Sequence, residues 1–155
     1  MKIADIRTNV TNVVAFITPF FETLVQNSHV TEYLMDATYK TNQPGYDLYA
    51  VLASVRGAGF PVAYMLVKNQ IGVKDAQSNA VMKFLKELKD RGLRPRFFHT
   101  DKDWSQINAI RTLWPEDCYV RLCAWHRSRS VRMVILSLHI SEAFRKPLIN
   151  AIYRN

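Results

Sequence analysis

The stretch YLMDATYKTN, residues 33–42, contains the residue around which the fold can be predicted. Apolar residues lead into a single acid, Asp36, and small polar residues follow. Such a run is typical of a strand, and a carboxylate within it is costly to bury unless a partner stabilises it. The sequence allows two kinds of partner for Asp36: backbone groups at a strand edge, or a metal ion shared with a second acid.

The residues that follow predict two more strands. NQPGYDL, residues 42–48, is a turn signal, and DLYAVLASV, residues 47–55, is rich in strand-forming side chains. RGAG, residues 56–59, is a tight turn before a further strand, FPVAYMLV, at 60–67. With residues 33–38, these runs predict a three-stranded antiparallel meander.

The second half of the chain alternates between helices and strands. Val81, Phe84, Leu85 and Leu88 follow the helical spacing, and Gly92 ends that helix. The predicted segments are a helix at 75–93, a strand at 94–100, a helix at 103–114, a strand at 118–125 and a helical tail at 128–155 broken at Pro147. We therefore predict an α/β chain whose mixed five-stranded sheet, an antiparallel meander plus two parallel strands, is flanked by helices. This order is that of the ribonuclease H-like fold, in which the fourth strand lies parallel to the first and beside it.

That topology gives Asp36 a neighbour, because Asp101 ends the fourth strand. Two adjacent carboxylates repel each other unless a proton or a cation lies between them. Mg²⁺ or Mn²⁺ suits an oxygen-only site and supports phosphodiester chemistry. Asp101 could instead cap the helix that follows, but Asp103 is better placed for that role. The sequence thus predicts Asp36 and Asp101 as metal ligands.

Three blocks of the sequence carry a family resemblance: LMDATYKTN at 34–42, FPVAYML at 60–66, and LRPRFFHTDKDWSQINAIRTLWPEDCYVRLCAWH at 93–126. Over residues 16–127 the chain resembles the catalytic domain of Mutator-like (MULE) transposases. The resemblance implies a ribonuclease H-like fold, Mg²⁺- or Mn²⁺-dependent cleavage and strand transfer of DNA, and a nuclear site of action. It also implies that Asp36 and Asp101 are the first two catalytic acids, and that Cys123 and His126 form the family's Cys-x-x-His element.

The chain departs from the family at the third catalytic acid. In the family a Glu follows a long helical insertion, whereas Glu142 is the only acid in this tail and comes too early. We therefore expect residues 1–155 to be a single domain truncated at its C-terminus, with 128–155 the start of the insertion. The alternative function is a catalytically inactive, domesticated or decayed remnant that keeps the fold and DNA binding. A more distant alternative is a ribonuclease H-type nuclease unrelated to transposition.

Several residues near these motifs have two interpretations each. Lys40 could contact a phosphate or the acids, or be a solvated strand end. Structural zinc needs four ligands, and Cys123 with His126 supplies two, so zinc is not expected. Cys123 could instead pack in the core, while His126 caps a helix or assists catalysis. Cys118 and Cys123 share a predicted strand at odd spacing, so they should point to opposite faces and form no mutual disulfide. Trp104, Trp114 and Trp125 could stack on bases, but we expect core or helix-packing roles for them.

The charge distribution favours DNA as a partner. The net charge of +8 comes entirely from residues 81–155, with fifteen Lys/Arg against seven Asp/Glu. Such one-sided basic character is typical of proteins that bind polyanions. Arg127, Arg129 and Arg132 could contact phosphates, or line a solvated helix face. No membrane span is expected, whereas the apolar run MVILSLHI at 133–140 favours a homo-oligomer through the C-terminal helix.

Overall fold

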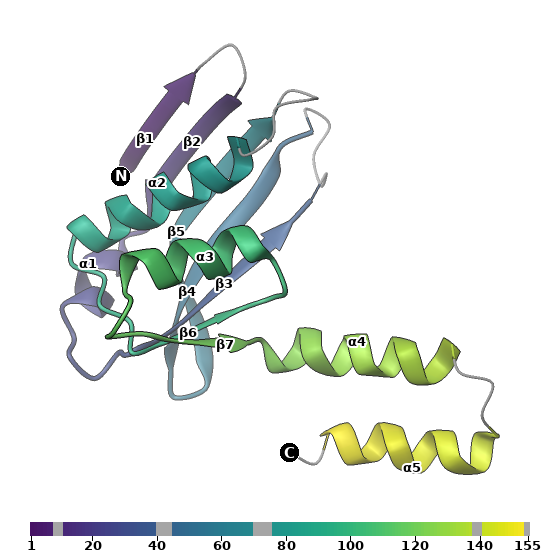
Figure 1. The fold of residues 1–155 in the computed structure, drawn as a ribbon. Helices are drawn as coiled ribbons and strands as arrows, with labels where there is room; N and C mark the ends of the chain where they lie inside the picture. The colour runs from purple at the N-terminus through teal and green to yellow at the C-terminus, as the bar shows by residue number, and fades with distance from the viewer. Residues whose placement is uncertain (8–10, 40–44, 70–75, 138–140, 154–155) are drawn as a thin grey trace. The chain divides into compact units, whose positions relative to one another are not determined.

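A computed structural model describes residues 1–7, 11–39, 45–69, 76–137 and 141–153 (Figure 1). The chain falls into two compact units, Met1–Arg121 and Leu122–Asn155, which are described separately below. The organisation as a single, truncated domain stays a prediction.

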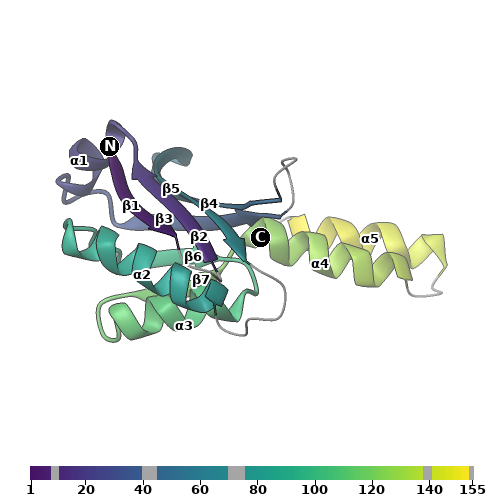
Figure 2. The same cartoon turned by 90° about the horizontal axis from the view of Figure 1, so that it is seen from above.

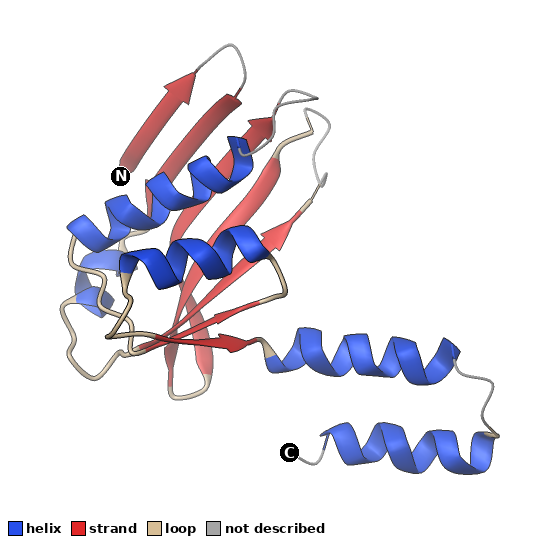
Figure 3. Cartoon of the chain, viewed as in Figure 1, coloured by secondary structure: helices blue, strands red, loops and turns tan. Residues whose placement is uncertain are grey.

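The first unit is built on a mixed sheet of seven strands in the order β1-β2-β5-β4-β3-β6-β7 (Figure 3). The strands are β1 (Lys2–Arg7), β2 (Thr11–Ile17), β3 (Glu32–Thr38), β4 (Asp47–Val55), β5 (Ala58–Asn69), β6 (Phe97–Thr100) and β7 (Tyr119–Leu122). The predicted count of five is therefore wrong, because β1 and β2 extend the meander beyond β5. Strand β2 has the signal of a half-buried strand, since Val13, Ala15 and Ile17 alternate with more exposed residues and are buried.

The order of the five predicted strands is confirmed. Strand β4 pairs antiparallel with both β3 and β5, which makes the meander. Strand β6 pairs in parallel with β3, as the alternation of elements predicts. The β4–β5 hairpin turns at Arg56 and Gly57, with φ values of 52° and 81°. Positive φ at both central residues is typical of a type I′ turn, whose twist matches that of the strands.

Helices cover one face of this sheet. The first unit has α1 (Phe20–Val25), α2 (Ala76–Asp90) and α3 (Trp104–Leu113), and α2 and α3 lie side by side on the same face (Figure 2). Strand side chains that point towards these helices, such as Tyr49, Met65 and Phe98, are fully buried. Side chains in the alternate positions, such as Leu34 and Tyr64, are only half-buried. We call the side of the sheet away from α2 and α3 the open face.

The second unit contains α4 (Ala124–Ser137) and α5 (Glu142–Tyr153). Pro147 lies inside α5, so the helix break predicted there is wrong; α4 instead ends ten residues earlier, at Ser137. Strand β7 is shorter than predicted, and Cys118 and Cys123 flank it as free thiols rather than sharing it. None of the described helices is long and apolar enough to cross a membrane.

Candidate active site

The pairing of β3 with β6 brings the two predicted acids to neighbouring strands. The parallel register pairs Glu32 with Phe97 and Leu34 with His99. Asp36 lies two residues further along β3, and Asp101 comes one residue after β6 ends, so the same register, if continued, would bring the two acids opposite each other. Because side chains alternate along a strand, Asp36 leaves the sheet on the same side as Leu34. We expect Asp101 on the same side, the open face.

The surroundings of the two acids fit a hard divalent cation. Asp36 is exposed and Asp101 is half-buried, so both solvent and a ligand can reach them. Mg²⁺ is commonly held by one or two carboxylates, with water and substrate phosphate completing its shell. Within the described residues no group of three or more His, Cys, Asp or Glu side chains forms a metal-binding cluster. A Mg²⁺ or Mn²⁺ ion shared by Asp36 and Asp101 stays a prediction.

The turn between β6 and α3 fixes Asp101. The Asp101 carboxylate accepts a hydrogen bond from the backbone N–H of Asp103, with an Oδ1–N distance of 2.8 Å. Asp103 is the N-cap of α3, and its Oδ1 accepts from the backbone N–H of Ser105 at 2.8 Å. The prediction that Asp103 rather than Asp101 caps the helix is confirmed. Asp101 lies outside the helix, directly after the end of β6.

A network of polar side chains ties this turn to the end of β3. The Tyr39 hydroxyl donates to Asp103 Oδ2 at 3.2 Å, and Gln106 Nε2 donates to the same oxygen at 3.4 Å. Gln106 is fully buried, and its Oε1 accepts from the hydroxyl of the equally buried Thr100. Burial, helped by the negative charge of Asp103, raises the pKa of Tyr39 to about 12. The tyrosine therefore stays protonated and remains a donor at neutral pH.

A second tyrosine supports the first. The ring of Tyr39 packs edge-on against Tyr49, with centroids 6.4 Å apart. Tyr49 is fully buried on the helix side of β4, and its hydroxyl accepts from Gln77 Nε2 in α2. Burial raises the pKa of Tyr49, and the neighbouring Tyr39 adds to the effect. Sequence reasoning missed both tyrosines, because a tyrosine that serves a polar network has the same pattern as one that fills a core.

The predicted auxiliary residues are Lys40, Cys123 and His126. Lys40 lies outside the described residues. Cys123 and His126 belong to the second unit, where the Cys123 carbonyl accepts from the backbone N–H of Arg127 at 2.9 Å. That bond opens α4, so His126 lies within its first turn and does not precede the helix as a cap would. The auxiliary roles of Lys40, Cys123 and His126 stay predictions.

The predicted DNA-binding arginines lie along α4. Arg127, Arg129 and Arg132 are all exposed, and Arg129 and Arg132 are three residues apart on the helix. Apolar side chains are exposed on the same helix, including Met133 at 61% and Val134 at 57%. DNA contact and homo-oligomer formation through this helix both stay predictions.

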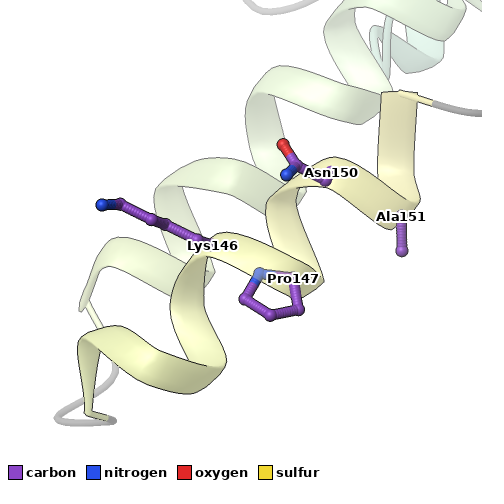
Figure 4. A pocket seen from close by; sticks show the side chains of 4 residues that line it. All are labelled: Lys146, Pro147, Asn150 and Ala151. Atoms are coloured by element: carbon purple, nitrogen blue, oxygen red, sulfur yellow. The ribbon is translucent and has the colours of Figure 1, made fainter.

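Two further surface features bear on the choice of site. A hollow of about 400 Å³ on α5 is lined by Lys146, Pro147, Asn150 and Ala151 (Figure 4). These four residues include no carboxylate, so the hollow does not compete with the acids as a metal-binding site. Trp114 is buried in the core, as predicted for the tryptophans, whereas Trp104, the first residue of α3, is 68% exposed and does not pack in the core.

Comparison with known protein families agrees with the site's geometry. Residues 32–130, well over half of the chain, match the model of the MULE transposase domain. The chain belongs to this family. The matched segment begins with β3 and contains both Asp36 and Asp101. The resemblance predicted from the three sequence blocks is thus confirmed.

Solved structures with partial similarity come from mobile-element and viral complexes. One is a chain of the simian T-cell lymphotropic virus intasome in complex with PP2A regulatory subunit B56 gamma, with 11% identity and a TM-score of 0.39, covering 77% of this chain and 46% of that one. Another belongs to the Drosophila P element transposase strand transfer complex, with 13% identity, a TM-score of 0.35, and coverage of 83% and 34%. This protein therefore spans less than half of either chain. No curated protein sequence matches it.

Proposed function

We propose that this transposase domain binds Mg²⁺ or Mn²⁺ through Asp36 and Asp101 and cleaves and joins DNA phosphodiesters. The observation that carries the proposal is the parallel pairing of β3 with β6, because Asp36 belongs to β3 and Asp101 directly follows β6. Membership of the MULE family supports the same assignment, because the matched residues include both acids. The net charge of +8 supports DNA as the substrate.

Each acid has a defined task in this proposal. A cation held between them would lower the pKa of the attacking water and offset negative charge at the scissile phosphate. The hydrogen bond from the N–H of Asp103 orients Asp101 and would reduce the side-chain entropy lost when a cation binds. Asp36 lies within the paired part of β3, opposite Ala50 of β4, so β4 fixes its backbone on one side. Arg127, Arg129 and Arg132 would contact the DNA backbone.

Calorimetric titration with Mn²⁺ tests the metal site. We expect the wild-type protein to bind the ion, and Asp36→Asn and Asp101→Asn each to weaken binding by roughly tenfold or more, since removal of even supporting groups has effects of this size. Asp90→Asn on α2 is the matched control, because Asp90 is an exposed acid paired with Lys86. Equal binding by the wild-type protein and both site variants would refute the paired-acid site.

A second candidate function is a non-catalytic remnant that retains the fold and DNA binding. It is favoured by one observation: the described residues contain no cluster of three potential metal ligands, and the tail acid Glu142 lies in the other unit. A plasmid-nicking assay with Mn²⁺ separates the two functions. Nicking that disappears in Asp36→Asn and Asp101→Asn supports the catalytic proposal, whereas metal and DNA binding without nicking supports the remnant.

The proposal extends to the fold family and the site of action. We assign the ribonuclease H-like fold on the strand order β5-β4-β3-β6-β7, with the first acid in β3 and the second after β6. We also propose that the protein acts in the nucleus, as the MULE resemblance implies. Microscopy of a fluorescent fusion tests this location, and exclusion of the fusion from nuclei would contradict it.

A further inference from the structure

An aromatic and cationic patch lies on strands β6 and β7, apart from the acids. The rings of Phe97 and Tyr119 stack with centroids 5.8 Å apart and an interplanar angle of 29°. The guanidinium carbon of Arg121 lies 3.9 Å from the centroid of the Phe97 ring, and that of Arg96 lies 5.7 Å from it. We call these four residues the β6–β7 patch.

The patch is accessible and positively charged. Tyr119 is 63% exposed, and both arginines are exposed. Among the described residues no carboxylate forms an ion pair with Arg96 or Arg121. The acid opposite Phe97 in the register, Glu32, is bonded to His99 at 2.6 Å. An anionic partner can therefore approach the two guanidinium groups without displacing an existing ion pair.

The patch and the acids share one face of the sheet. Phe97, His99 and Asp101 follow each other at alternate positions along and just beyond β6, so their side chains leave the sheet on the same side. Four residues of extended chain separate Phe97 from Asp101, which is roughly 13 Å. That length corresponds to about four nucleotide steps of a stacked strand. A single DNA strand with a phosphate at the acids would thus reach the patch within a few nucleotides.

Stacked rings flanked by guanidinium groups are suited to single-stranded nucleic acid. Bases stack on aromatic side chains whatever their sequence, and arginine adds both a cation–π contact and attraction for phosphate. A tyrosine that served only to fill the core would be buried, whereas Tyr119 is mostly exposed. We propose that the β6–β7 patch binds the single-stranded end of the DNA substrate, stacking a base on Tyr119 and leading the strand towards Asp36 and Asp101. This inference rests on the proposed function and defines where its DNA strand lies.

Fluorescence anisotropy with a labelled single-stranded oligonucleotide tests the patch, in EDTA so that no cleavage occurs. We expect Tyr119→Ala to weaken binding about fivefold or more, and Tyr119→Trp to retain it, because tryptophan also stacks. Arg121→Ala should weaken binding and reduce the slope of log affinity against log salt concentration by about one. Arg111→Ala is the matched control, since Arg111 is an exposed arginine on α3, away from the open face.

The outcomes separate this inference from the proposed function. If wild-type protein binds both Mn²⁺ and the oligonucleotide, and Tyr119→Ala and Arg121→Ala bind the oligonucleotide as tightly as Arg111→Ala, the patch is refuted while the metal site stands. If the patch variants lose oligonucleotide binding but bind Mn²⁺ like the wild type, the patch is supported, and their Mn²⁺ binding shows that the fold is intact. If the wild type binds Mn²⁺ but no single-stranded DNA, the inference is wrong. If it binds neither, the proposed function fails as well.

Discussion

Replacement of Asp103 by alanine should destabilise the protein more than its half-exposed position suggests. The Asp103 carboxylate accepts hydrogen bonds from the backbone N–H and the hydroxyl of Ser105, at 2.8 and 2.6 Å. It also accepts from Tyr39 and from Gln106, which connects the ends of β3 and β6 to the start of α3. Asp103→Ala removes all four acceptor contacts at once.

The magnitude follows from the groups left without an acceptor. Loss of an N-cap side chain costs about 1 kcal/mol in the free energy of unfolding. Gln106 is fully buried, so its abandoned amide N–H group costs about 1–3 kcal/mol more. We assign nothing to the Tyr39 hydroxyl, because Tyr39 is 47% exposed and can donate to water. The expected total is about 2–4 kcal/mol.

Urea unfolding followed by circular dichroism measures this loss. Asp103→Ser should recover about 1 kcal/mol, because serine restores the cap but cannot reach the other donors. Asp90→Ala is the control: it removes an exposed acid from an i,i+4 ion pair with Lys86 and should cost less than about 1 kcal/mol. A cost for Asp103→Ala no greater than that for Asp90→Ala would refute the network as a stabilising element.

Three further predictions concern residues of the first unit. Burial raises the pKa of Tyr33 to about 12. The stability that its protonated form provides is therefore complete below pH 10 and is lost as the pH rises from 10 to 12. Tyr33→Phe should move the pH midpoint of alkaline unfolding upward, and an unchanged midpoint would contradict this. Burial, helped by Asp117, raises the pKa of Cys118 to about 11. At pH 8 the native protein should therefore hold roughly a hundredfold less Cys118 thiolate than the protein unfolded in urea, and it should react far more slowly with iodoacetamide. Equal reaction rates in the two states would show that the thiol is not shielded. Arg56 has a φ of 52° in the β4–β5 turn, a conformation that asparagine tolerates better than arginine. Arg56→Asn should therefore raise the free energy of unfolding by a few tenths of a kcal/mol or more. A melting temperature below that of the wild type would argue against the turn assignment.

Much of the fold could be predicted from local patterns. The strands at 33–38, 47–55 and 60–67 were marked by β-rich runs and by turns with glycine, and each is present. The spacing of apolar residues predicts helix α2, and Gly92, with a φ of 105°, ends that helix as predicted. The helix break at Pro147 was wrong, because a proline excludes one backbone donor but does not by itself decide where a helix ends.

The candidate site likewise has parts that local sequence patterns predict and parts that they do not. Asp36 and Asp101 could be paired from the order of elements, because a strand that returns after a helix lies parallel to its neighbour. Tyr39, Tyr49 and Gln106 could not be predicted as partners of the turn after β6. Tyr49 bonds to Gln77 and Tyr39 to Asp103, and these partners are 28 and 64 residues apart, so no local pattern encodes the two contacts.

The sequence by itself determined the family and the order of the central elements, and it predicted the two acids, because periodicity, turn residues and motif blocks are properties of neighbouring residues. Only the tertiary structure decided that β1 and β2 extend the sheet, that α2 and α3 share one of its faces, and that Tyr119 and Arg121 lie beside Phe97. The physical reason is that strand pairing and side-chain packing depend on which distant segments meet, and a strand's edge and faces are defined only once its neighbours are in place. The pairing of β3 with β6 likewise joins segments more than sixty residues apart, which no local pattern encodes.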